Sequence, residues 1–291
     1  MKPAPFEYHA PATLDDAVGL LGELGDAAKV LAGGQSLIPM LALRLAFFEH
    51  LVDLGRIEQL QRIERVDGSL RIGAGVRQSA VERSTEAAAA VPLLARATPL
   101  IGHVQIRNRG TVGGSIAHAD PAAEYPAVAL TLDAVMEVAS PRGAREVPAA
   151  EFFAGTWTTD LADDEVLTAL RLPVWDGRCG FAVEELARRH GDFAIAGATI
   201  ALELAADDTV RRCAIGLFGV GPVPERGAAA ERAAVGTSVG DIDPSALGEH
   251  AAAGLASVPD DAHGPAGYRR HVAGVMVARG WRRAVEEAAR G

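Results

Sequence analysis

The first sixty residues alternate between helical and strand spacing of apolar side chains. Thr13 precedes two acids and then apolar residues at helical spacing, which predicts a capped helix ending near Gly25. Short apolar runs at 28–32 and 51–54 predict buried strands, and the apolar density at 37–45 predicts another helix. The order helix, strand, glycine loop, helix, strand predicts a small α/β unit.

From residue 60 onward the pattern combines a hairpin with Ala-rich helical segments. Asp67-Gly68 is a hairpin turn signal between two alternating stretches, 60–66 and 69–72. Pro92 interrupts an otherwise helical segment at 80–97. The other elements predicted before residue 176 are a glycine turn at 110–114, a helix at 122–132, a strand at 134–139 and a strand end at 171–173.

The pattern changes after Gly177 and predicts a separate α+β domain. Three strands are predicted at 181–186, 198–204 and 210–219, and Asp207-Asp208 forms a turn between the last two. From Leu247 onward the spacing is helical.

Composition restricts the classes of partner. The chain has 291 residues and a net charge of -10, which argues against a nucleic-acid binder because such a protein needs a basic surface. No apolar run approaches the roughly 18 residues of a membrane helix, and the first residues lack the apolar core of a signal peptide. We therefore expect a cytoplasmic protein without a membrane span.

Two cysteines, Cys179 and Cys213, lie far apart in the sequence. A disulfide framework is not expected from such a pair. A cysteine-ligated iron–sulfur cluster takes four thiolates, so this chain cannot hold one alone.

Two glycine pairs are each followed closely by serine. Ala32-Gly33-Gly34-Gln35-Ser36 lies between a predicted strand and helix, with Lys29 just upstream, and Thr111-Val112-Gly113-Gly114-Ser115 repeats the chemistry. Either they are unrelated turns, or their backbone amides hold a diphosphate from both sides. Ser36 would cap the helix or donate to a phosphate oxygen. We favour the diphosphate because the pattern occurs twice.

Two further segments allow a structural and a functional interpretation. In the stretch after Ser115, Asp120 and Glu124 either begin a helix or accept hydrogen bonds from sugar or ribityl hydroxyls, and His118 lies beside them. The charged segment from Arg188 to Phe193 is either a solvated turn or a cover over a flat cofactor.

Other glycine patterns do not support a nucleotide fold. Gly73-Ala74-Gly75 lacks the third glycine of the dinucleotide fingerprint, and Pro222 blocks a helix after Gly216, Gly219 and Gly221. A Rossmann domain is therefore not predicted, and no P-loop is present.

The four motifs, together with the opening F-E-Y-H-A-P-A-T-L-D-D-A, resemble the FAD-binding medium subunits of the xanthine oxidase and carbon monoxide dehydrogenase family of molybdenum hydroxylases. The resemblance covers essentially the whole chain. It implies an α+β fold of the vanillyl-alcohol-oxidase (PCMH) type. The implied parts are FAD-binding subdomains at 1–57 and 58–176 and a C-terminal α+β domain at 177–291.

The resemblance also implies which residues contact non-covalently bound FAD. Members of the family often carry His at Gln35, Asn at Ser115 and Tyr at Phe193, so we expect altered hydrogen bonds with binding retained. We assign no catalytic acid or base and no metal ligand to this chain. The implied FAD contacts are Lys29, Val30, Leu31, Ala32, Gly33, Gly34, Gln35, Ser36, Leu37, Ile101, Thr111, Gly113, Gly114, Ser115, His118, Asp120, Glu124, Leu167 and Phe193.

The implied function is electron transfer within a larger oxidoreductase complex. A large subunit would carry the molybdenum cofactor, and a small subunit would carry two two-iron two-sulfur clusters. Electrons would pass from these clusters to the FAD and then to an external acceptor. The implied assembly is a dimer of heterotrimers.

Two alternatives remain at this stage. A self-sufficient flavoenzyme of the same fold would need a proton donor near the flavin, or a His or Cys attached to it, and His103 is the one awkward candidate. A nucleotide-binding scaffold that has lost the flavin is the other alternative. The intact glycine pairs argue against such a decayed site.

Overall fold

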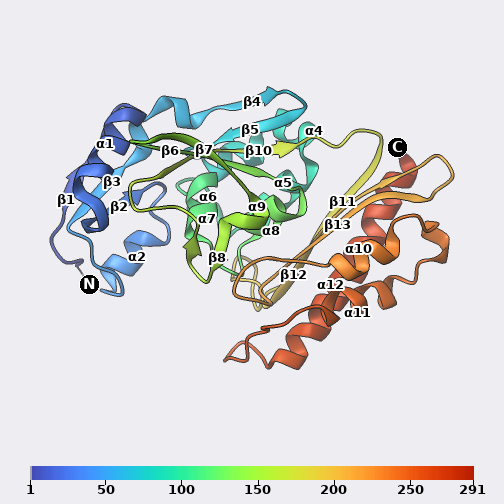
Figure 1. Ribbon diagram of the computed structural model, residues 1–291. Helices are drawn as coiled ribbons and strands as arrows, with labels where there is room; N and C mark the ends of the chain where they lie inside the picture. The colour runs from blue at the N-terminus through green and yellow to red at the C-terminus, as the bar shows by residue number, and fades with distance from the viewer. Residues whose placement is uncertain (1) are drawn as a thin grey trace.

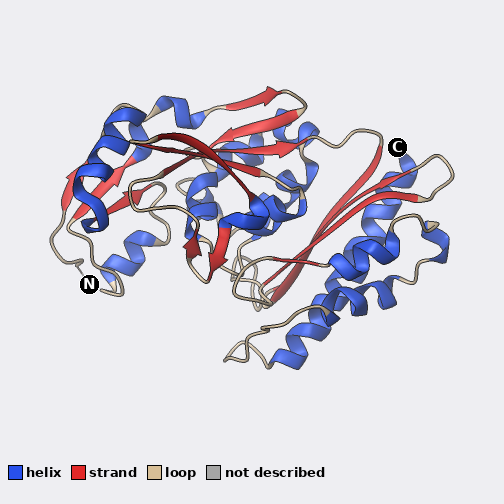
Figure 2. Cartoon of the chain, viewed as in Figure 1, coloured by secondary structure: helices blue, strands red, loops and turns tan. Residues whose placement is uncertain are grey.

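The computed structural model describes residues 2–291, in which three larger sheets follow one another along the chain (Figures 1 and 2). A separate two-stranded sheet lies in the sequence between strands of the second. The first sheet has the order β1-β3-β2 and is parallel. Helix α1 packs on one face of it through Ala17, Val18 and Leu21. The elements of this part are β1 (Glu7–His9), α1 (Leu14–Leu24), β2 (Ala28–Leu31), α2 (Leu37–Ala42) and β3 (His50–Asp53).

The second sheet is antiparallel, with the order β4-β5-β10-β6-β7. Its helices bury a large apolar core against it. Its strands are β4 (Ile63–Val66), β5 (Ser69–Gly73), β6 (Val135–Ser140), β7 (Gly143–Pro148) and β10 (Val166–Pro173). Its helices are α3 (Gln78–Arg83), α4 (Thr85–Ala90), α5 (Pro92–Ala97), α6 (Val104–Arg107), α7 (Val112–His118), α8 (Glu124–Thr131) and α9 (Ala149–Phe152). The strands β8 (Phe153–Gly155) and β9 (Thr158–Thr159) form the separate two-stranded sheet.

The third sheet is an antiparallel meander whose two faces have different neighbours. The helix α12 covers one face, and Trp281 is buried there (Figure 1). The other face lies against α8, where the hydroxyls of Thr131 and Thr199 are 2.6 Å apart. The elements are β11 (Arg178–Leu186), β12 (Ala196–Leu204), β13 (Val210–Phe218), β14 (Glu225–Arg226), α10 (Ala228–Ala234), α11 (Pro244–Ala253) and α12 (Ala266–Arg290).

Most predicted elements are confirmed, and the α+β class is confirmed with them. Thr13 caps α1 by accepting a hydrogen bond from the Asp16 amide, and Gly25 ends that helix with φ of 55°. The predicted hairpin turn is present, with Asp67 and Gly68 both at positive φ. Among residues 2–291, no helix combines the length and the apolar character that crossing a membrane requires.

Three predicted details are wrong. Helix α2 ends at Ala42 and not at residue 45, because Arg44 takes a left-handed conformation with φ of 59°. Residues 110–114 are not simply a turn, since Gly113 and Gly114 lie in the first turn of α7. The N-cap position of α8 is Ala123, so Asp120 does not cap that helix.

Candidate functional site

The first glycine loop has a row of unused hydrogen-bond donors. It joins β2 to α2 and contains Gly34 at φ of 72°. The Gln35 side chain donates to the Gly33 carbonyl at 3.1 Å and so braces the turn. The four amides from Gly33 to Ser36 find no acceptor within residues 2–291. Successive amides of this kind form a concavity suited to an anion.

Residues flanking this loop give it charge and a free hydroxyl. Ser36 occupies the N-cap position of α2 without donating or accepting a capping bond, so the helix-cap interpretation is wrong. The exposed Lys29 ammonium lies 5.7 Å from the Phe48 ring centroid. The other predicted contacts here are Val30 and Leu31 in β2, Ala32 in the loop, and Leu37 at the start of α2.

The second glycine loop uses its amides inside the protein. The Thr111 hydroxyl accepts from the Gly114 amide at 3.0 Å and caps α7. The Gly113 amide donates to the Ala74 carbonyl at 2.9 Å. The amides of Gly113 and Gly114 therefore already have acceptors within the protein, unlike the amides of the first loop. The half-buried Ser115 follows them in the first turn of the helix.

The two loops nevertheless meet in space. A Cβ atom built at Gly33 would lie 2.7 Å from the Gly110 Cα and closer still to the Arg109 carbonyl. One built at Gly114 would lie 3.5 Å from the Ala32 Cβ and 4.0 Å from the Gly33 nitrogen. The missing side chains thus let two backbones touch, which places the first loop beside the start of α7.

The end of α7 carries a polar group that includes a residue the sequence did not indicate. The His118 ring stacks on Trp157 with centroids 6.4 Å apart, and the Trp157 indole donates to Asp120 at 3.3 Å. Burial lowers the pKa of His118. The charge of Asp120 acts in the opposite direction, and the charge of Lys29 lowers the pKa further. An isolated tryptophan in the sequence was too weak a signal to predict the contacts of Trp157 with His118 and Asp120.

Two buried carboxyl groups lie in the region where α8 packs against the third sheet. Glu124 is only 7% exposed, and burial raises its pKa to about 8, with the charge of Glu185 adding to the effect. Burial also raises the pKa of Glu185 to about 7, and its buried Oε2 atom has no partner within residues 2–291. Glu185 is the second residue here that sequence patterns missed.

The segments that contain Ile101 and Phe193 lie against each other. Gly191, at φ of 85°, approaches so closely that an added Cβ would be 2.7 Å from the His103 ring. Arg107 fixes the opposing segment by donating to the Ile101 carbonyl at 3.1 Å. Phe193 is 69% exposed, so its ring is free to cover a ligand on this side.

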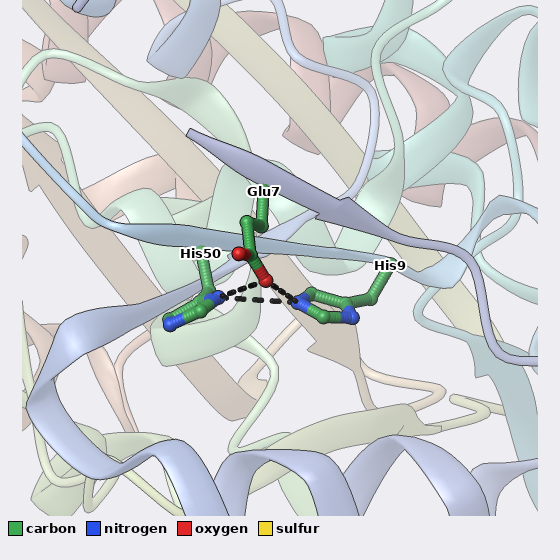
Figure 3. Close-up of side chains that lie close together, drawn as sticks. All are labelled: Glu7, His9 and His50. Carbon is green, nitrogen blue, oxygen red and sulfur yellow. Dashed lines mark hydrogen bonds and ion pairs between the residues drawn. The ribbon is translucent and has the colours of Figure 1, made fainter. Parts of the chain in front are cut away.

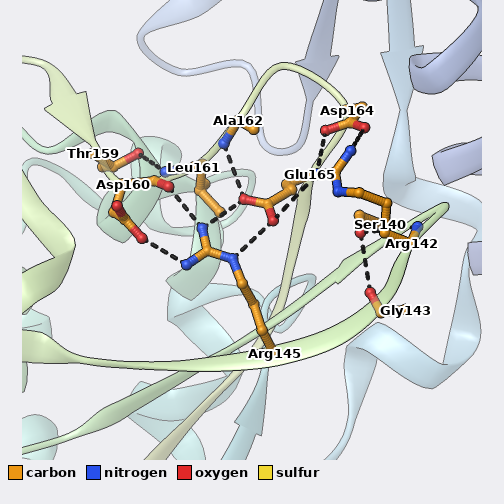
Figure 4. Close-up of polar contacts among 10 residues, drawn as sticks. All are labelled: Ser140, Arg142, Gly143, Arg145, Thr159, Asp160, Leu161, Ala162, Asp164 and Glu165. Carbon is orange, nitrogen blue, oxygen red and sulfur yellow. Dashed lines mark hydrogen bonds and ion pairs between the residues drawn. The ribbon is translucent and has the colours of Figure 1, made fainter.

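Leu167 differs from the other predicted contacts because its side chain belongs to the core. It is 5% exposed in β10. The segment leading into that strand is held by Arg145, which donates to both oxygens of Glu165 and, at 2.6 Å, to Asp160 (Figure 4). The hydrogen bond from Arg145 lowers the pKa of Glu165. This network fixes the backbone around Leu167.

Two family models match the chain. The model described as the FAD binding domain in molybdopterin dehydrogenase matches residues 4–175, and the CO dehydrogenase flavoprotein C-terminal domain matches residues 181–284. The carbon monoxide dehydrogenase medium chain of Hydrogenophaga pseudoflava is 39% identical over 96% of both chains. The 6-hydroxypseudooxynicotine dehydrogenase complex subunit alpha of Paenarthrobacter nicotinovorans is 37% identical over 99% of this chain and 97% of that subunit.

Solved structures share the fold over nearly the full length. A structure of the Hydrogenophaga pseudoflava carbon monoxide dehydrogenase that lacks the Mo-pyranopterin moiety of its cofactor gives a TM-score of 0.95 at 40% identity, covering 99% of both chains. Quinoline 2-oxidoreductase from Pseudomonas putida 86 gives a TM-score of 0.93 at 34% identity, with 99% coverage of both chains.

Proposed function

This chain belongs to the family of FAD-binding medium subunits of heteromeric molybdenum hydroxylases, and from that premise we propose how its residues hold the flavin. The fold is that family's α+β flavoprotein fold, and the chain is an oxidoreductase subunit. The observation that carries the proposal is the run of four unpaired amides beside the start of α7. A diphosphate supplies the oxygen acceptors that such a run needs.

The first loop would bind the diphosphate of FAD. In this arrangement the amides of Gly33–Ser36 and the Ser36 hydroxyl donate to phosphate oxygens, and Lys29 contributes positive charge. Gly114 closes the site by lying against the first loop, and Thr111 holds the helix start that positions Ser115. The full set of residues proposed for the diphosphate side is Lys29, Val30, Leu31, Ala32, Gly33, Gly34, Gln35, Ser36, Leu37, Thr111, Gly113, Gly114 and Ser115.

The other predicted residues would hold the sugar, ribityl and ring portions. Asp120 would accept from hydroxyls, with Trp157 orienting it, and His118 would remain neutral through its burial. Because burial raises the pKa of Glu124 to about 8, its carboxyl would be protonated at neutral pH and would donate a hydrogen bond as well as accept one. Ile101 and Phe193 would border the isoalloxazine, while Leu167 would contribute its backbone.

The protein's task would be to position FAD for electron transfer. When bound, FAD supplies the redox chemistry, taking electrons from the two-iron two-sulfur clusters of a small partner subunit and passing them to an external acceptor. A large partner would carry the molybdenum cofactor, in a dimer of heterotrimers. The relatives support partners because they are medium chains and complex subunits, which also favours a heteromer over a single-chain flavoenzyme.

We further propose the domain limits 1–57, 58–176 and 177–291, and a cytoplasmic location. The three sheets support the limits, since each sheet lies within one of these ranges. The proposed limit at 176/177 also falls between the two family matches, the first of which ends at residue 175 and the second of which begins at residue 181. The free thiols of Cys179 and Cys213 suit a reducing compartment.

Substitution at Gly34 tests the loop assignment. Gly34→Ala places a side chain at φ of 72°, which strains and reshapes the row of amides, and we expect FAD affinity to fall at least tenfold. Gly68→Ala is the matched control, because Gly68 has φ of 74° and open space around it in a distant hairpin. Flavin absorbance per chain and FAD titration measure the effect. Equal FAD affinity in the two variants would contradict the assignment.

A further inference from the structure

Strand register gathers three potential metal ligands on one face of the first sheet. Glu7 and His9 are two residues apart in β1, so their side chains share a face. His50 in β3 is the register partner of Glu7, and therefore lies on the same face. Figure 3 shows the three side chains converging from the two strands. None of them takes part in the proposed flavin site.

The ligand atoms are close enough to share one ion. His9 Nε2 and His50 Nδ1 are 3.2 Å apart. Glu7 Oε2 lies 3.5 Å from His50 Nδ1 and 4.0 Å from His9 Nε2. Zinc–ligand bonds of about 2.0–2.1 Å in a tetrahedral site place neighbouring ligand atoms roughly 3.3–3.5 Å apart. Small side-chain rotations would therefore bring all three atoms onto one centre.

Burial and charge also suit a cation. The His9 and His50 side chains are 26% and 18% exposed, so packing already holds the two imidazoles facing each other. The Glu7 side chain is 74% exposed and can adjust to complete the set. Two neutral imidazoles and a carboxylate carry one negative charge and leave a coordination position open to water.

We propose that Glu7, His9 and His50 form a binding site for a divalent transition-metal ion of the zinc type. Imidazole nitrogen and carboxylate oxygen are ligands that Zn²⁺ accepts readily. The ion ties β1, a strand of three residues, to β3 across 41 positions of sequence. The sequence alone did not indicate it because the third ligand becomes adjacent only through the parallel pairing of the two strands.

Metal titration of the full-length, untagged and chelator-stripped chain tests the proposal. Competition with a chromophoric chelator should give one Zn²⁺ per chain, and Co²⁺ should give the visible absorption of a tetrahedral ion. His50→Gln and Glu7→Gln should each weaken binding at least tenfold. His250→Gln, which removes an exposed histidine from α11, should bind Zn²⁺ like the native chain.

A thermal measurement gives a second readout. Zn²⁺ should raise the Tm of the native chain and of His250→Gln, because an ion that binds only the folded state stabilises it. The rise should be absent in Glu7→Gln, whose exposed side chain can be replaced without disturbing packing. Binding of far less than one equivalent, or unchanged affinity in both site variants, would overturn the proposal. FAD content should be the same in all four proteins, which separates this test from that of the flavin site.

Discussion

Gly114 lies against both the capping Thr111 hydroxyl and the first glycine loop, and a side chain there would disturb both contacts. A Cβ atom would lie 2.7 Å from the capping Thr111 hydroxyl and 3.5 Å from the Ala32 Cβ of the first loop. We expect Gly114→Val to reduce flavin content at least tenfold, since the γ-carbons must push the loops apart or break the cap. Loss of the cap would also lower the free energy of unfolding by about 1 kcal/mol. Flavin absorbance and urea unfolding measure the two effects.

Gly19→Ala is the control for this substitution. Gly19 lies in α1, and an added Cβ would meet nothing within 4 Å. We expect full flavin content and a free energy of unfolding unchanged or raised by up to about 1 kcal/mol, the helix-propensity difference between the two residues. Normal flavin content in Gly114→Val would refute the role given to the second loop.

At the residue scale, the sequence predicted that the two glycine loops meet, but not the hydrogen bonds that their amides make. Paired glycines can be recognised in the sequence, so the meeting of the two glycine loops was predictable. That Gly113 donates to Ala74, and Gly114 to Thr111, depends on the segment after β5 and on a helix cap, which periodicity along the chain does not contain. Trp157 was not predicted because its contacts with His118 and Asp120 cross nearly forty residues of sequence.

At the element scale, the burial of Glu124 at the start of α8 and of Glu185 in β11 should make stability depend on pH. Burial raises the pKa of Glu124 from its ordinary value of 4.5 to about 8 in the folded chain. The folded state thus keeps a proton that the unfolded chain releases. The stabilisation is complete below about pH 4.5 and is lost as the pH rises towards 8. Glu185, with its pKa raised to about 7, acts in the same direction.

The substitution Glu124→Gln isolates this effect. The amide keeps the shape and stays neutral, so we expect its free energy of unfolding to fall less steeply between pH 5 and 8, by roughly 1 kcal/mol per pH unit relative to the native chain. Urea unfolding of the flavin-free protein measures the slope. Glu86→Gln, in the exposed first turn of α4, should keep the native slope. Parallel curves for Glu124→Gln and the native chain would show that this carboxyl is ionised in the fold.

Helices and strands were predictable where residues close in the sequence, such as turn and cap residues, determine where they begin and end. The β4–β5 hairpin follows from Asp67-Gly68, and α1 follows from its cap and spacing. The early end of α2 was not predictable, because Leu41 packs in a small core with Leu31 and Leu51 while the chain turns left-handed at Arg44. The order of strands in the second sheet depends on contacts between distant segments, which periodicity does not contain.

At the scale of the whole molecule, the chain exposes apolar side chains that a partner would cover. Leu43, Leu45 and Phe47 are 55%, 71% and 62% exposed in the segment after α2, and Ile38 within α2 is 44% exposed. Large exposed apolar side chains gathered within ten residues of sequence suit an interaction surface. Because only α2 separates this segment from the first glycine loop, a partner subunit bound there would lie near the proposed flavin site.

The double substitution Leu45→Glu and Phe47→Glu should therefore break the complex while sparing the flavin. Two charges at an apolar interface would lose their hydration on assembly, so we expect at least a tenfold loss of partner chains in co-purification from cells that express all subunits. Flavin content should be unchanged, because neither side chain is among the proposed FAD contacts. Val235→Glu, at an exposed apolar position in the C-terminal part, should leave the complex intact. A complete complex in the double variant would place the partner interface elsewhere. A stable and active single chain would argue against assembly altogether.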